Sequence, residues 1–185
     1  MANIPDLSLA TRDGLPEALR VLLADHPRDG WRAHPEFGGL TQFWLDKHLG
    51  FRRMLTTLQS DLEGRVAGTL DPEVHASRLA RLGSMFLQEL HGHHGIEDAV
   101  YFPKMVAAAP DLDRAFALLD ADHHELHEQL EGFAQTANGV LHRKMEAGRM
   151  LERVAVMDRF LERHLTDEED VIVPVILRIG ERHFG

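Results

Sequence analysis

Hydrophobic side chains recur every three or four positions along four long stretches of the chain, which is the spacing of an amphipathic helix. The stretches run from Thr41 to Gly64–Gly68, from Asp71-Pro72-Glu73 to Pro103, from Asp111 to Asn138-Gly139, and through Met150 to about Gly180. The connections between them are short, which favours neighbouring helices that run in opposite directions. The pattern therefore predicts an all-α fold, an antiparallel up-down four-helix bundle.

Residues 1–40 precede this pattern and form a short extension. Asp13 and Pro16 have the residue types that begin a helix, and this helix would run to about His26. The following loop carries Trp31 and Phe37, so we expect the extension to pack on the bundle. The predicted organisation is an N-terminal helical extension over residues 1–40 and a bundle domain over residues 41–185.

Polar residues interrupt the apolar stripes of the second and fourth helices in the same way. Each carries a His, a Glu four positions later and a Pro six positions after that: His93, Glu97 and Pro103 in one, His164, Glu168 and Pro174 in the other. A helix turns once in 3.6 residues, so each His and Glu project from one face. Pro103 should end or kink its helix, and Pro174 should kink the fourth.

Histidines also occupy core positions on the first and third helices. Counting residues from each turn, at about 1.5 Å of rise per residue, places these groups at one height in the bundle. The set that can meet in one layer is His48, His93, Glu97, His123, His127, His164 and Glu168. His91 and His94 fall on other faces of the second helix, and we expect both at the surface or outside the direct ligand set.

A buried layer of this kind needs a positive charge. An ionised carboxylate in an apolar interior costs several kcal/mol or more unless it is paired. Any single His–Glu pair at this spacing is more simply a surface contact. That explanation does not account for the whole set, because three separate spacings coincide with apolar stripes. A metal site accounts for all of them.

Composition limits what the metal and the partners can be. The chain has no Cys, which excludes disulfides, thiolate nucleophiles and iron–sulfur clusters. Its formal charge of −10 and the lack of a basic run argue against nucleic acid and anionic membranes. The expected partners are small molecules or other proteins. Because neither a signal peptide nor a bilayer-spanning run is visible, the expected location is the cytoplasm.

The ligand types favour iron. Five imidazoles and two carboxylates are too many for one tetrahedral zinc and too rich in nitrogen for calcium or magnesium, but they suit two iron ions. The ferritin-like di-iron class uses Glu-x-x-His pairs, and the sequence contains none. A zinc-protease motif, His-Glu-x-x-His, is also absent, because Glu125 stands in the wrong place between His124 and His127.

The seven residues resemble the ligand set of the hemerythrin-like (HHE cation-binding) domain, and the similarity covers about Thr41 to Leu177. It implies two non-haem iron ions joined by an oxo or hydroxo bridge. By the resemblance, His123, His127 and His164 bind one iron, His48 and His93 bind the other, and Glu97 and Glu168 bridge them. The invertebrate oxygen carriers of the family space the last carboxylate one residue further on, which leaves Glu169 as an alternative to Glu168. The repeat with Glu97 favours Glu168.

The two halves of the ligand set differ at one position. If His48 corresponds to His123, the place of His127 is taken by Arg52, which cannot bind a metal. One iron would then keep an open position for dioxygen, nitric oxide or peroxide. Alternatively, Arg52 turns outward and pairs with an acidic residue.

Three functions follow from this reading. The preferred one is a non-enzymatic di-iron protein that carries or senses dioxygen or a related small ligand, or handles iron or nitric oxide. The alternative is an oxidase- or peroxidase-like di-iron enzyme, for which His94 and Tyr101 are the candidate acid or base groups. The third is a helical interaction module in which metal serves stability alone. The family's iron-centre repair members carry a Cys-bearing extension, which this chain lacks.

Overall fold

The computed structural model describes residues 7–184, and within that range every regular element is helical. The α-helices are α1 (Gly39–Val66), α2 (Pro72–Ile96), α3 (Phe102–Ala108), α4 (Asp113–Leu141) and α5 (Ala147–Ile179). The 3₁₀ turns are η1 (Glu17–Leu19), η2 (Val21–Leu23), η3 (Arg28–Ala33), η5 (Pro110–Leu112) and η6 (Glu181–His183), and η4 (Glu97–Tyr101) is a π-helical turn. The prediction of an all-α fold of four long packed helices is confirmed.

The described chain forms two compact units, each built from parts of α1, α2, α4 and α5. The first unit comprises residues 7–48, 95–124 and 163–184, and the second comprises residues 49–94 and 125–162. The unit boundaries therefore lie within the long helices.

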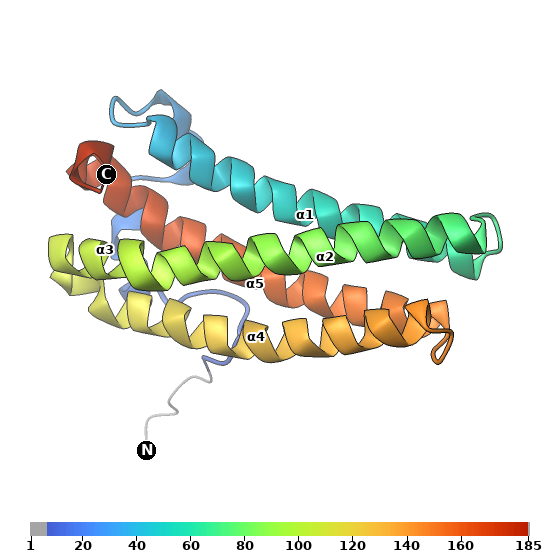
Figure 1. Ribbon diagram of the computed structural model, residues 1–185. Coiled ribbons are helices and arrows are strands. Elements are labelled where there is room, and N and C mark those ends of the chain that lie inside the picture. The colour runs from blue at the N-terminus through green and yellow to red at the C-terminus, as the bar shows by residue number, and fades with distance from the viewer. Residues whose placement is uncertain (1–6, 185) are drawn as a thin grey trace, which may run out of the picture. The chain divides into compact units, whose positions relative to one another are not determined.

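The second unit holds two helical hairpins and an aromatic core. Residues 67–71 join α1 to α2 and residues 142–146 join α4 to α5, so each pair of helices is antiparallel (Figure 1). Gly68 ends α1 with a φ of 74°, a conformation that costs glycine little. Phe86 lies between Phe51 and Phe133, with ring centroids 6.5 Å and 5.5 Å apart. These three fully buried rings link α1, α2 and α4.

The core of the first unit includes side chains from the N-terminal extension. Leu15, Leu19 and Leu22 are buried in one cluster with Trp44 of α1 and apolar residues of α3, α4 and α5. Trp31 of η3 packs with Val173 and Leu177 of α5 in a second, smaller cluster.

The extension does not contain the single short helix that the sequence predicts between Asp13 and His26. It forms η1 and η2, separated by Arg20 with φ −128° and ψ 40°. A helix of this length is marginal by itself. The break at Arg20 instead lets leucines on both turns reach the core, so burial overrides helix propensity here.

The second predicted helix is also interrupted, at the position of its carboxylate. α2 ends at Ile96, the π turn η4 spans Glu97–Tyr101, and α3 continues from Phe102. Pro103 stands in the first turn of α3, where its missing N–H costs little. The expected end or kink before Pro103 is thus realised as a π turn, a feature often found at functional sites.

Several boundaries differ from prediction by a few residues, as is usual for helix ends. α4 begins at Asp113 rather than Asp111 and runs through Asn138-Gly139 to Leu141. α5 continues past Pro174 and ends at Ile179, next to its predicted end at Gly180. No helix in residues 7–184 combines the length and apolar character needed to cross a membrane.

Asp71 caps α2 at the point where the sequence pattern predicts that this helix begins. Its Oδ1 accepts hydrogen bonds from the backbone N–H groups of Glu73, at 2.9 Å, and Val74, at 3.1 Å. We expect Asp71→Ala to lower the free energy of unfolding by about 1 kcal/mol, and Asp71→Ser to retain most of it. Urea unfolding of the metal-free protein measures both. Equal stability of the Ala variant and the wild type would show that this cap contributes nothing.

Candidate metal centre

Three buried histidines of the first unit each direct one ring nitrogen at a carboxylate. His48 of α1 places Nδ1 3.0 Å from Glu169 Oε1, and His123 of α4 places Nδ1 2.7 Å from Asp98 Oδ1. His164 of α5 places Nδ1 3.4 Å from Asp122 Oδ2. A carboxylate in this position accepts the Nδ1 proton, which fixes the tautomer and leaves Nε2 with a lone pair.

The three Nε2 atoms point at two further carboxylates. Glu168 Oε2 lies 3.5 Å from Nε2 of His48 and 3.4 Å from Nε2 of His164. Glu97 Oε2 lies 3.7 Å from Nε2 of His123. Two ligands that share an ion at about 2.1 Å lie roughly 3 Å apart, so these separations suit donors arranged around cations.

The site is closed to solvent and acidic. His48, His164 and Glu168 have no exposed surface, and Glu97 is 1% exposed. The ligand atoms that His48, Glu97 and Glu168 offer lie within 4.8 Å of one another. Trp44 donates its indole N–H to Glu168 Oε1 at 2.9 Å, so the second oxygen is the one that faces the imidazoles. Each glutamate therefore has one oxygen aimed at histidine nitrogens.

Burial raises the pKa of Glu97 to about 8, and the charge of Asp98 adds to the rise, whereas hydrogen bonds with Glu168 and Trp44 act the other way. Burial also raises the pKa of Asp122, against the opposing effect of the Arg12 guanidinium. Glu97 and Glu168 are close together and deeply buried, so ionising both of them without a cation would cost much free energy. The electrostatics and the lone pairs on Nε2 both fit bound metal.

Within the first unit, the structure brings together five predicted ligands: His48, Glu97, His123, His164 and Glu168. It also distinguishes Glu168 from Glu169. Glu168 faces the Nε2 atoms, whereas Glu169 accepts the Nδ1–H of His48. The geometry therefore favours Glu168 as the ligand.

The other two predicted ligands lie in the second unit. His93 is half-buried on α2, four residues before Glu97, with its ring centroid 5.2 Å from that of Phe51. His127 is on the surface of α4, with a side chain 60% exposed and Nε2 3.4 Å from Glu131. The buried stripe of α4 continues through Leu126, Leu130 and Phe133, which leaves His127 outside it.

Burial excludes the surface position for His94 that the sequence analysis allowed. His91 is exposed, but His94 is 6% exposed. It stands three residues before Glu97 in the same helical run, a spacing that places the two on one side of the helix. That spacing was visible in the sequence. The stronger His93–Glu97 repeat masked it.

Arg52 takes the outward alternative. Its Nε donates to Glu162 Oε2 at 2.6 Å within the second unit. The Nδ1 partners of the three histidines were not predicted, yet each adjoins a predicted ligand in the sequence: Asp98 follows Glu97, Asp122 precedes His123, and Glu169 follows Glu168. Adjacency to a ligand was the only available signal.

Residues 39–176 match the family model described as the hemerythrin HHE cation binding domain. No curated protein and no solved structure matches the chain. All five clustered residues fall within the matched range, whereas Arg12 and Arg28 precede it.

The raised pKa of Glu97 predicts how the stability of the metal-free protein depends on pH. The folded chain retains a proton that the unfolded chain releases near the ordinary glutamate value of 4.5. The stabilisation is therefore complete below about pH 4.5 and is lost as the pH rises to about 8. At about 1.4 kcal/mol per pKa unit, the effect is at most a few kcal/mol.

Unfolding with urea across this pH range, in the presence of a chelator, should show a steeper loss of stability for the wild type than for Glu97→Gln. The exposed-site variant Glu131→Gln should follow the wild type, because Glu131 is 63% exposed. Parallel curves for wild type and Glu97→Gln would refute the assignment of a buried protonated Glu97.

Proposed function

Because the protein belongs to the hemerythrin HHE cation-binding domain family, as the match over residues 39–176 shows, we propose that it is a non-haem di-iron protein that reversibly binds dioxygen or a related small ligand. The observation that carries this proposal is Glu168, whose Oε2 faces Nε2 of both His48 and His164. A carboxylate between imidazoles from two helices is suited to bridge two ions.

In this proposal each iron has its own histidines, and the glutamates are common to both. His48 belongs to one ion and the pair His123 and His164 to the other, with Glu97 and Glu168 shared. His93 would bind the same ion as His48, since it lies four residues before Glu97 in one helical run. We assign the place of His127 to His94, and this choice is supported by the burial of His94 and the exposure of His127.

Ferrous iron, when bound here, supplies electrons that a small oxygen- or nitrogen-containing ligand can accept reversibly. The protein orients the ligand side chains and excludes water from the site. The Nδ1 carboxylates hold three imidazoles in the tautomer that binds metal through Nε2. The ring of Phe102 stacks on His123 with centroids 5.4 Å apart, and Trp44 covers Glu168, so both shield the ligands from water.

An oxidase- or peroxidase-like enzyme is the second candidate, and one observation favours it. Tyr101 contacts Trp44 edge to face, with ring centroids 4.8 Å apart, and Trp44 donates a hydrogen bond to Glu168. Two oxidisable aromatic rings that contact each other beside Glu168 could pass electrons between the site and a reductant. A carrier has no need of such a path.

Anaerobic loading with ferrous iron, followed by air and then removal of oxygen, tests the proposal. A carrier or sensor should bind about two irons per chain and gain a visible charge-transfer band that disappears when oxygen is removed. Irreversible oxidation with turnover of a reductant would favour the enzyme. Bound iron that never responds to oxygen would indicate a structural metal, and failure to bind iron would refute the proposal.

Single substitutions test the ligand assignment. His93→Ala, Glu97→Ala and His164→Ala should each lose bound iron and lower thermal stability in the presence of iron, because metal binding adds to folding free energy. His94→Ala should lose iron from one position. His127→Ala is the matched control on the exposed side of α4 and should keep two irons per chain, as measured by metal analysis. The reverse result for His94 and His127 would restore His127 as the ligand.

A further inference from the structure

We propose that the N-terminal extension contributes two positioning residues, Arg12 and Arg28, to the metal centre. Each arginine holds a carboxylate that in turn orients one of the metal-binding histidines. This inference rests on the proposed function and concerns how the same site is controlled. Both arginines precede residue 39, where the match to the family model begins.

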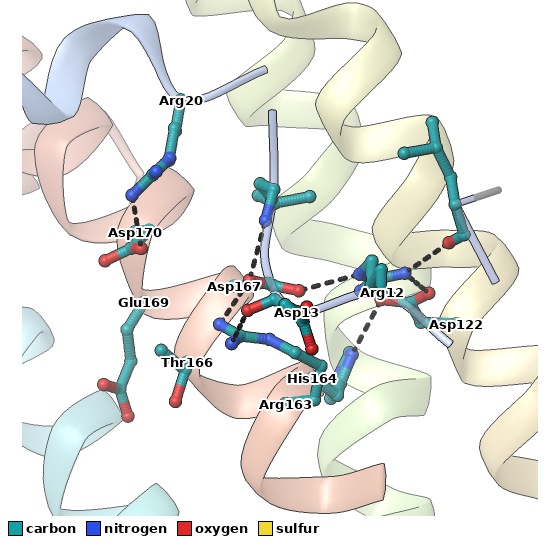
Figure 2. A network of polar contacts seen from close by, with 12 residues as sticks. Arg12, Asp13, Arg20, Asp122, Arg163, His164, Thr166, Asp167, Glu169 and Asp170 are labelled. Carbon is teal, nitrogen blue, oxygen red and sulfur yellow. Dashed lines mark hydrogen bonds and ion pairs between the residues drawn. The ribbon is translucent and has the colours of Figure 1, made fainter. Parts of the chain in front are cut away.

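Arg12 acts on His164 through Asp122. The Arg12 side chain is 2% exposed, and both of its terminal nitrogens contact the Asp122 carboxylate, with Nη1 2.6 Å from Oδ1 and Nη2 paired with Oδ2. Asp122 Oδ2 faces Nδ1 of His164 at 3.4 Å. Figure 2 shows this chain of contacts running from the extension to α4 and on to α5.

The Arg12 guanidinium is itself held on the opposite side. Its Nε donates to Asp167 Oδ2 at 2.8 Å, and Asp167 Oδ1 also accepts from Arg163 at 2.6 Å (Figure 2). The backbone N–H of Leu15 donates to the same Asp167 oxygen at 3.2 Å. The extension and α5 therefore fix Arg12 in one orientation.

Arg28 repeats the arrangement at His48. Its Nη1 donates to Glu169 Oε2 at 2.8 Å, and the other oxygen of Glu169 faces Nδ1 of His48 at 3.0 Å. Its Nε donates to Asp170 Oδ1 at 2.6 Å, and Nη2 donates to the Thr166 carbonyl at 2.8 Å. Two arginines of one short segment thus reach two different histidine–carboxylate pairs.

The need for these arginines follows from burial. Asp122, Asp167, Glu169 and Asp170 are all buried, and buried carboxylates are costly unless paired. The guanidinium is suited to this task because its planar fork can bind one carboxylate with two hydrogen bonds while the remaining nitrogen binds another. Asp98, the partner of His123, is 37% exposed, so water can stabilise its charge.

The effect on bound iron has a definite direction. Partners of this kind typically change metal affinity by about 10- to 100-fold, because they fix the orientation of the ligand ring. Each arginine also places a positive charge near the site, which favours the reduced iron. Removing it should weaken metal binding and shift the reduction potential to more negative values.

The test uses the full-length chain with Arg12→Ala, Arg28→Ala and the two corresponding Lys variants. Iron affinity is measured by competition with a chelator, and the reduction potential by spectroelectrochemistry. We expect both Ala variants to bind iron about 10-fold or more weakly and to show lower potentials, with Lys restoring the potential more than the affinity. Arg143→Ala is the control, because Arg143 forms an exposed ion pair with Glu73.

A readout that needs no iron separates this inference from the proposed function. Nitrogen-15 NMR of the metal-free protein should show the Nδ1–H tautomer of His164 disturbed in Arg12→Ala, and that of His48 disturbed in Arg28→Ala. Arg28 has a partly exposed side chain, so its variant tests the idea if Arg12→Ala fails to fold. Unchanged tautomers, affinity and potential would refute the inference alone, whereas a wild type that binds no iron would refute the proposed function.

Discussion

The structure depends on the burial of two glutamates among imidazoles. Glu97 and Glu168 have almost no exposed surface, and they face Nε2 atoms of His48, His123 and His164. In an apolar interior such carboxylates must be protonated, paired or bound to a cation. Membership of a cation-binding family favours the third outcome, which is the one we propose. The π turn that begins at Glu97 is the backbone adjustment that accompanies this site.

The burial of the site also explains why further charged residues surround its histidines and glutamates. The imidazoles need acceptors for their second nitrogen, and these acceptors are themselves buried carboxylates. Asp122 and Glu169 are stabilised by arginines of the N-terminal extension, while the leucines of that extension lie in the core of the first unit. Apolar packing and ion pairing thus anchor the same segment, and both place it beside the buried histidines and glutamates.

Much of this arrangement could be predicted from the sequence because helical periodicity reports which residues share a face. The four helices and the placing of His48, Glu97, His123, His164 and Glu168 on their buried faces follow from spacing. Periodicity failed where two neighbouring residues compete for one stripe. On α4, Leu126 lies inside and His127 outside, a difference of one residue in a wide stripe. The sequence pattern also missed the break at Arg20 and the burial of His94.

The arginine contacts could not be predicted in this way. Arg12 and Asp167 are 155 positions apart, and nothing in the pattern around either residue specifies the other. Their pairing follows from tertiary packing, which brings an irregular segment against two helices. Such a contact becomes visible only once the fold is known.

X-ray diffraction from iron-loaded crystals, with anomalous scattering recorded at the iron absorption edge, would locate the ions relative to Glu97 and Glu168. We expect two iron peaks in one layer, both within bonding distance of the Glu168 carboxylate and each bound by histidine Nε2. A single peak, or iron located away from Glu168, would contradict this expectation.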